Sequence, residues 1–151
     1  MSNNIFPYVN LDPFQEQQIL VKKQDEFPEL IEMDLDLETL KIKLNKGGNI
    51  LLVYRDDALK VWIYKALRTV RYRYVAYTWN FGNEAEKLIG LPNTKELRES
   101  ELERYTREAL SISKYIKLLY NFSFEYTHDK IICNFFVDSI YSTGMVINFS
   151  V

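Results

Sequence analysis

The chain of 151 residues contains one cysteine, Cys133, and one histidine, His128. A single cysteine cannot close a disulfide within the chain, and one residue of each kind cannot build a Cys/His zinc cluster. We therefore expect a protein that is made in a reducing compartment and that is stable without a metal or any other cofactor.

Long apolar runs and catalytic motifs are also lacking. No run of about 18 apolar residues occurs, and residues 1–14 show no secretion signal, so we expect a soluble protein. The glycine-rich phosphate loops and the H-E-x-x-H and G-x-S-x-G motifs are missing as well. His128 falls in a predicted turn, and Cys133 alternates with apolar neighbours as a buried small hydrophobe does. We expect no enzymatic activity, and release of peptidoglycan by the purified protein would contradict this.

Hydrophobic residues make up 47% of the chain and aromatic residues 15%, which is enough for one domain with a real core. Charge is segregated along the sequence, although the net charge is only −2. Residues 1–38 carry nine carboxylates and two lysines (−7), whereas residues 39–75 carry nine basic residues and two aspartates (+7). This segregation predicts ion pairing within the chain or between subunits.

The sequence divides into an arm and a domain. Residues 1–38 follow no helical or strand period and contain three prolines, which indicates an extended arm with at most a short helix at residues 12–20. The apolar residues of the arm are too sparse to fold alone, so we expect it to dock on its own domain or on a neighbour. Residues 39–151 are expected to form a single small α+β domain.

Residues 57–70 have the pattern of a core helix. Asp56 and Asp57 can cap its first turn, and apolar residues then recur at spacings of three and four. The apolar stripe consists of Leu59, Trp62, Ile63, Ala66, Leu67 and Val70. We expect this stripe to pack on a mostly antiparallel sheet.

Alternating apolar residues predict a hairpin of residues 40–44 and 50–54, with its second strand covered on both faces. Residues 72–79 are predicted to be extended, residues 84–89 to form a short helix, and residues 95–111 to form a surface helix capped by Asn93 or Thr94. The C-terminal third predicts three strands with a period of two. Their inward residues are Ile116, Leu118, Tyr120, Phe122, Phe124 and Tyr126, then Ile131, Cys133, Phe135 and Val137, and finally Met145, Ile147, Phe149 and Val151.

Two surfaces are candidates for binding. The last predicted strand, residues 145–151, is expected at a sheet edge, where its N–H and C=O groups can pair with a strand of a partner chain. The segment from Arg68 to Arg73, with Tyr72, Tyr74 and Tyr77, interleaves arginines with aromatic residues, which suits phosphate contacts with base stacking and equally suits a protein interface. Because the acidic arm can neutralise this segment, protein binding is favoured and nucleic-acid binding is the alternative.

Residues 62–84 read WIYKALRTVRYRYVAYTWNFGNE, and a charged helix and then FSFEYTHDKIICNFFVDSIYSTG follow. This pattern resembles the XkdS-like phage tail proteins, which are similar to the sheath-initiator wedge proteins in the baseplates of contractile tails. The resemblance covers roughly residues 39–151 and includes little of the arm. The Glu-Pro-Arg tripeptide of the better-known relatives does not occur here, so no residue contacts are transferred from them.

The resemblance implies a structural baseplate wedge subunit that is made in the bacterial cytoplasm and built into the tail particle in multiple copies around a ring. Its expected partners are other wedge proteins, the tail sheath protein and, as a further candidate, the central hub or tube, but no membrane and no nucleic acid. Contacts with wedge proteins would involve Arg68, Arg71, Tyr72, Arg73, Tyr77 and Trp79. Pairing with sheath strands would involve Met145, Val146, Ile147, Asn148, Phe149, Ser150 and Val151, and would nucleate sheath assembly.

Overall fold

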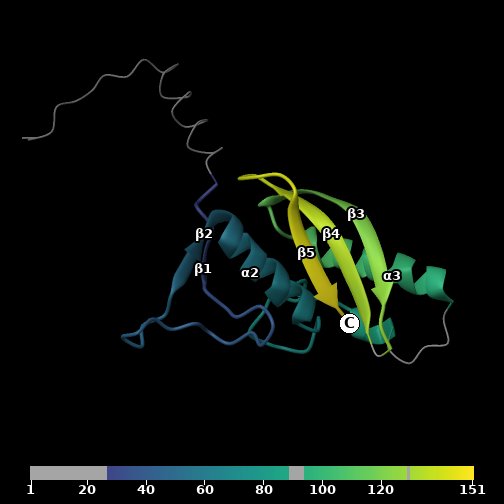
Figure 1. The fold of residues 1–151 in the computed structure, drawn as a ribbon, viewed down its shortest axis with the longest axis horizontal. Helices are drawn as coiled ribbons and strands as arrows, with labels where there is room; N and C mark the ends of the chain where they lie inside the picture. The colour runs from purple at the N-terminus through teal and green to yellow at the C-terminus, as the bar shows by residue number, and fades with distance from the viewer. Residues whose placement is uncertain (1–26, 89–93, 129) are drawn as a thin grey trace, which may run out of the picture.

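The computed structural model describes residues 27–88, 94–128 and 130–151. These residues form two helices, a short 3-10 helix and two separate antiparallel sheets (Figure 1). The predicted α+β class is therefore confirmed. The helix expected at residues 12–20 and most of the expected arm lie outside the described residues.

The core helix is α2, Arg55–Arg68. It buries most of the predicted stripe and also Ala58 and Val61, whereas Trp62 is only partly buried. The predicted capping by Asp56 is wrong: Tyr54 is the N-cap residue, and the Asp56 carboxylate instead accepts a hydrogen bond of 2.6 Å from the Ser139 hydroxyl. The helix thus begins earlier than predicted and is tied by its first turn to the C-terminal sheet.

The larger sheet has the strand order β3-β4-β5. Its strands are β3, Ile116–Tyr126, β4, Ile131–Ser139, and β5, Met145–Ser150. Cys133, Phe135 and Val137 of β4 are fully buried, as their alternation predicts. The odd-numbered residues Ile147 and Phe149 of β5 are buried beside them. The inward faces of these two strands are therefore confirmed.

The inward face of β3 is only partly as predicted. The register of β3 against β4 shifts between Ile116 and Leu118 and again between Tyr120 and Ser123, where Asn121 has a φ of 53°. Because an extra residue in a strand reverses the alternation, Leu118 is 54% exposed and Leu119 is buried in its place. The predicted inward positions of Leu118 and Tyr120 are wrong for this reason, since Tyr120 lies opposite Phe136 on the outer face of the sheet.

The smaller sheet pairs β1, Ile31–Met33, with β2, Leu52–Tyr54. The predicted hairpin turn is present, since Leu44 and Ile50 form an antiparallel bridge, but β2 pairs with β1 and not with residues 40–44. The prediction that residues 50–54 are covered on both faces is wrong, because Leu52 and Tyr54 are exposed. Part of the expected arm is therefore a strand of the fold.

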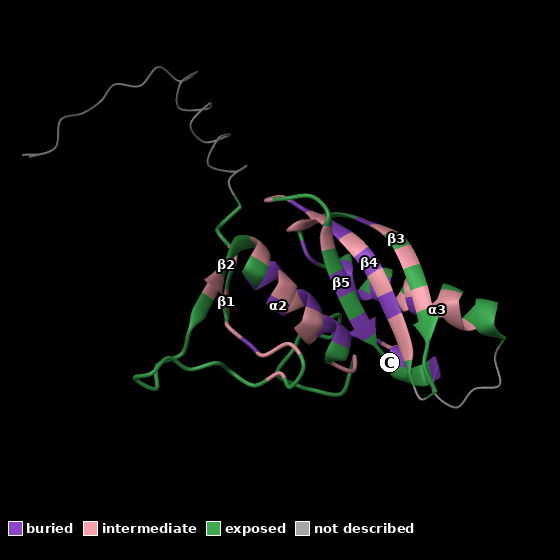
Figure 2. Ribbon diagram, in the orientation of Figure 1, coloured by how far each residue is buried: buried purple, intermediate pink, exposed green. Residues whose placement is uncertain are grey.

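The helices α2 and α3, Lys95–Leu110, cover one face of the larger sheet (Figures 1 and 2). The core between them joins Leu59 and Ile63 of α2, Leu102 and Leu110 of α3 and the buried residues of the sheet. The predicted cap of α3 is confirmed, because the Thr94 hydroxyl accepts a hydrogen bond from the Leu97 N–H. The 3-10 helix η1, Ala85–Leu88, replaces the predicted short helix and adds two buried side chains to this core.

Candidate partner-binding site

The outer edge of β5 is the first candidate surface. Within the part of the chain that the structure describes, β5 pairs with β4 alone. The N–H and C=O groups of Val151 both bond to Ile131, at distances of 3.0 Å. Since main-chain groups alternate in an antiparallel ladder, the odd-numbered residues of β5 bond to β4, and Val146, Asn148 and Ser150 direct theirs away from it.

The predicted strand-pairing residues therefore divide into two sets. Ile147 and Phe149 anchor the strand, because their side chains are buried in the core. Val146, Asn148 and Ser150 have exposed side chains, which strand alternation places on the face opposite the buried ones. The second set can accept a partner strand without disturbing the first.

The second candidate surface is a loop of residues 70–82, here called the aromatic loop. Its neck is closed by a parallel bridge between Val70 and Asn83, in which the Asn83 N–H bonds to the Thr69 carbonyl (2.8 Å) and the Arg71 N–H to the Asn83 carbonyl (3.1 Å). The prediction of an extended segment at residues 72–79 is wrong, because these residues form successive turns and Tyr72 has a φ of 67°. The segment is a compact loop with adjacent ends.

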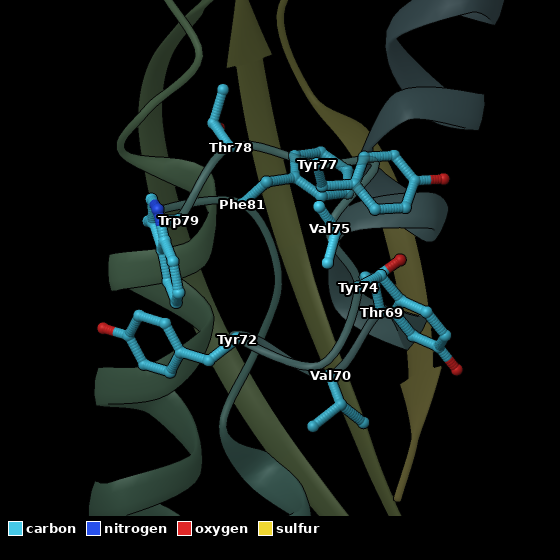
Figure 3. A pocket seen from close by; sticks show the side chains of 9 residues that line it. All are labelled: Thr69, Val70, Tyr72, Tyr74, Val75, Tyr77, Thr78, Trp79 and Phe81. Atoms are coloured by element: carbon cyan, nitrogen blue, oxygen red, sulfur yellow. The ribbon is translucent and has the colours of Figure 1, made fainter.

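The aromatic loop presents its side chains to solvent. Trp79 is 76% exposed, Val75 is fully exposed, and Tyr72, Tyr74 and Tyr77 are about half exposed. Figure 3 shows these side chains around a hollow of about 90 Å³. Exposed tyrosine and tryptophan on a closed loop are typical of protein interfaces.

Ring contacts hold the aromatic loop in place. The Tyr77 and Phe81 rings are stacked with centroids 4.6 Å apart, and the rings of Phe81 and Trp62 of α2 are nearly perpendicular, with centroids 5.8 Å apart. The ring centroids of Tyr72 and Trp79 are 6.1 Å apart, and Figure 3 shows the two rings side by side. A surface fixed in this way loses little conformational entropy when a partner binds.

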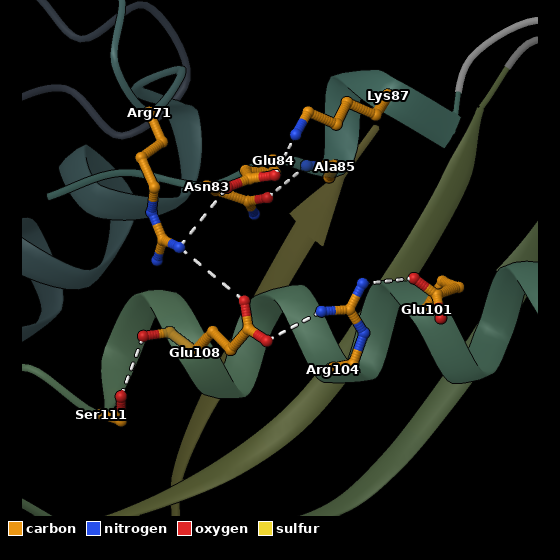
Figure 4. A network of polar contacts seen from close by, with 9 residues as sticks. All are labelled: Arg71, Asn83, Glu84, Ala85, Lys87, Glu101, Arg104, Glu108 and Ser111. Atoms are coloured by element: carbon orange, nitrogen blue, oxygen red, sulfur yellow. Dashed lines mark hydrogen bonds and ion pairs between the residues drawn. The ribbon is translucent and has the colours of Figure 1, made fainter. Parts of the chain in front are cut away.

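The predicted arginines are not a free basic patch. Arg71 is only 12% exposed and lies 3.6 Å from Glu84 and 3.7 Å from Glu108 (Figure 4). Arg73 pairs with Glu86 at 2.9 Å, and the Arg68 guanidinium donates to the Glu38 carbonyl. Tyr72, Tyr77 and Trp79 are thus brought together on one surface, whereas Arg71 lies inside the fold and supports that surface.

The ion pairs around Arg71 form a chain of alternating charge that links the loop neck to η1 and α3. In order, its members are Lys87, Glu84, Arg71, Glu108, Arg104 and Glu101. The hydrogen bond from Lys87 lowers the pKa of Glu84 below its ordinary value, and the charges of Lys87 and Arg71 act in the same direction. The loop neck is therefore held by charge as well as by main-chain bonds.

Metal and thiol chemistry find no support in the described residues. No group of three or more His, Cys, Asp or Glu side chains in them could hold a metal ion. Burial raises the pKa of the Cys133 thiol to about 12, and the nearby Glu103 charge contributes. None of the helices in the described ranges is long and apolar enough to cross a membrane.

Sequence reasoning missed the exposure of Val75 and, although Gly82 can be recognised as a residue free to adopt a positive φ, it missed the close approach of the chain at Gly82. An isolated valine between tyrosines gives no signal that distinguishes an exposed contact from a core residue. The signal for Gly82 is its place after an aromatic run: its φ is 111°, and a Cβ atom there would lie 2.7 Å from the Thr69 carbonyl oxygen. Only glycine fits where the two ends of the loop approach so closely.

A family model matches most of the residues that form this fold. A search of the curated proteins found no match. The model of the contractile injection system sheath initiator matches residues 31–142, from β1 to just beyond β4. This range begins eight residues before the resemblance noted in the sequence and ends before β5. Since the match covers most of the chain, the protein belongs to the sheath initiator family of contractile injection systems.

Proposed function

We propose that the protein is a baseplate wedge subunit that joins the inner baseplate to the sheath and nucleates sheath assembly by accepting a strand on β5. Family membership supports a structural role in a contractile injection system, as opposed to an enzymatic one. The observation that carries the finer proposal is the outer edge of β5, where Val146, Asn148 and Ser150 direct their main-chain groups away from β4.

Strand addition suits a joint that must survive contraction. Each outward residue of β5 offers one N–H donor and one C=O acceptor, so a partner strand gains a continuous ladder of main-chain bonds. The ladder does not depend on side-chain detail. A sheath subunit held in this way can therefore turn during contraction while its strand stays paired.

The aromatic loop is the proposed contact with neighbouring wedge proteins in a ring of several copies, with the hub or tube as a further candidate partner. Tyr72, Tyr77 and Trp79 supply the rigid apolar surface, and Arg68 and Arg73 are the neighbouring cations along the chain. The loop and the β5 edge involve different residues, so one subunit can contact both kinds of partner at once.

A proline at position 148 tests the strand-pairing proposal. Asn148→Pro removes an outward N–H group and leaves the bonds of β5 to β4 in place, because prolines are tolerated where a strand edge faces solvent. We expect baseplates carrying this variant to assemble without sheath, as seen by electron microscopy. Asn148→Thr keeps the N–H group and should give normal sheaths, and sheaths of normal length on the proline variant would refute the proposal.

The Asn148→Pro variant is a more specific test of strand pairing than deletion of residues 145–151. The deletion would remove Ile147 and Phe149, which are part of the core, and would expose the residues packed on them. Loss of sheath after such a deletion would not distinguish an absent edge from a damaged fold.

Nucleic-acid binding, the alternative from sequence, is disfavoured by the geometry. Arg71 is held between two glutamates, and Arg73 pairs with a third. Binding through phosphates would weaken steeply between low and physiological salt, whereas we expect wedge assembly to persist over that range.

A further inference from the structure

We infer that a groove beside β5 receives one aliphatic side chain of Val, Ile or Leu size from the incoming strand, and that this side chain sets which strand the protein accepts. The inference rests on the proposed function, since it assumes that β5 pairs with a strand of the sheath protein. It adds a specificity site to a main-chain ladder that has little sequence preference of its own.

The groove lies at the C-terminal half of β5 and has a volume of about 300 Å³. One wall is the strand itself, and the other is the end of α2 with the neck of the aromatic loop, which Figure 1 shows on the side of β5 away from β4. The lining residues are Leu67, Arg68, Thr69, Val70, Asn83, Ala85, Glu86, Phe149, Ser150 and Val151. The groove is thus continuous with the open edge that a partner strand would occupy.

The strand register sends a partner side chain into this groove. Residues that lie directly opposite each other on paired strands point to the same face of the sheet. Phe149 and Val151 point to the helix-covered face, as the burial of Phe149 and the packing of Val151 on the core show. A partner residue placed beside either of them therefore points between β5 and the end of α2.

The chemistry of the groove favours an uncharged, branched side chain. Leu67, Ala85 and Phe149 are buried and form its apolar floor. The charged groups at its margin are already engaged, Arg68 with the Glu38 carbonyl and Glu86 with Arg73. An aliphatic side chain fits this floor, whereas a charged one would lose its hydration without gaining a partner. β-branched residues are also favoured in strands.

The test uses the full-length protein and the purified sheath protein of the same tail particle as the probe. Val151→Phe fills the groove from the β5 side, and Val70→Phe fills it from the loop neck. Ser123→Phe is the control, since it adds the same ring at an exposed position of β3, away from the β5 edge. Each variant's unfolding midpoint in urea is measured first, and its affinity for immobilised sheath protein second.

We expect both groove-filling variants to bind at least about tenfold more weakly, which is the scale of losing one buried aliphatic side chain. The control should stay within about twofold of the original protein. The variant Asn148→Pro distinguishes the groove inference from the strand-pairing proposal. If the proline variant loses binding while both groove-filling variants bind normally, the groove inference fails and strand pairing stands. If the proline variant binds normally, strand pairing itself fails.

Two further outcomes would also overturn the inference. Equal weakening by Val151→Phe and Ser123→Phe would mean that the loss does not depend on filling the groove. A dimer of the protein alone that Val151→Phe abolishes would mean that the groove accepts a second copy of this chain. Light scattering of the protein without sheath protein measures its mass and so shows whether such a dimer forms.

Discussion

Gly82 is the residue on which the aromatic loop depends most directly. We predict that Gly82→Ala lowers the free energy of unfolding by about 2–4 kcal/mol, because the new Cβ atom would press on the Thr69 carbonyl oxygen at 2.7 Å. Urea denaturation measures this loss. Gly48→Ala is the control: its φ is 77° but its Cβ atom would meet nothing within 4 Å. It should cost only about 1 kcal/mol, and equal costs would contradict the role of the contact.

Cys133 is the residue for which sequence and structure agree most simply. Because burial raises the thiol pKa to about 12, almost no thiolate exists in the folded protein at pH 8, and the thiolate is the reactive form. We predict that iodoacetamide leaves Cys133 unmodified in the native protein at pH 8 and modifies it in urea. Mass spectrometry measures the extent of labelling in each state. Rapid labelling of the native protein would show that the thiol is accessible and would contradict the prediction.

At the scale of elements, sequence periodicity predicted the helices and the two inner-facing strands well. The stripe of α2 and the alternation of β4 are local patterns, and their physical cause is also local. In each element the apolar side chains fall on one face, and that face is buried. The pairing of β1 with β2 was missed because it joins residues 31–33 to 52–54 across an intervening loop. Periodicity carries no information on such a choice of partner.

The candidate site was predicted in part for the same reason. The sequence predicts a contact surface in the aromatic residues after α2, and the structure shows that Tyr72, Tyr77 and Trp79 are exposed; their role in contacts stays a prediction. The turn at Tyr72 was missed because a tyrosine rarely adopts a positive φ. Once the chain turns there, Arg71 faces Glu84 and Glu108 instead of solvent. The sequence shows the residue types but not which of them the turn buries.

The two edges of the larger sheet differ, and this difference has consequences for self-association. Two register shifts interrupt β3, and Arg107 of α3 donates to the Leu119 carbonyl at 3.0 Å. Bulges and basic side chains are common protections of strand edges. β5, by contrast, pairs with β4 without a register shift, so no bulge interrupts its outer edge. A sheet with two such edges could pair head to tail without end.

We predict that removing the protection of β3 causes the purified protein to self-associate. The variant combines Arg107→Ala with deletion of Asn121, and light scattering should show oligomers that increase with concentration. Arg104→Ala on the same helix is the control and should leave the protein monomeric. Adding Asn148→Pro should suppress the oligomers if they form edge to edge. Oligomers that persist in the proline variant would indicate misfolding instead.

At the scale of the whole molecule, the segregated charges pair within the chain. Glu29, Glu32 and Asp34 reach Arg55, Lys65 and Lys43, at 2.9, 2.6 and 3.1 Å respectively. These contacts hold the strand β1 and its flanks against α2 and the hairpin segment that contains Lys43. The predicted ion pairing between the acidic and basic segments is therefore found inside one subunit.

We predict unequal contributions from these ion pairs. Glu32→Gln should lower the free energy of unfolding by about 1–2 kcal/mol, because it leaves the half-buried Lys65 ammonium without its partner. Glu29→Gln should change it by less than about 0.5 kcal/mol, because the Glu29–Arg55 pair is exposed and screened by water. Chemical denaturation of both variants provides the comparison, and similar losses for the two would contradict the dependence on burial.

The position of β4 between two neighbours also determines how the amide hydrogens of this molecule exchange with solvent. In the described residues it is the one strand bonded on both sides, so its amides should exchange only when the domain opens as a whole, whereas those of β1 and β2 should exchange through local opening. In β5 the pattern should alternate by residue: Ile147 and Phe149 slow, Val146, Asn148 and Ser150 fast. When a strand joins β5, this alternation should disappear, and the edge strand should acquire the slow exchange of an interior one.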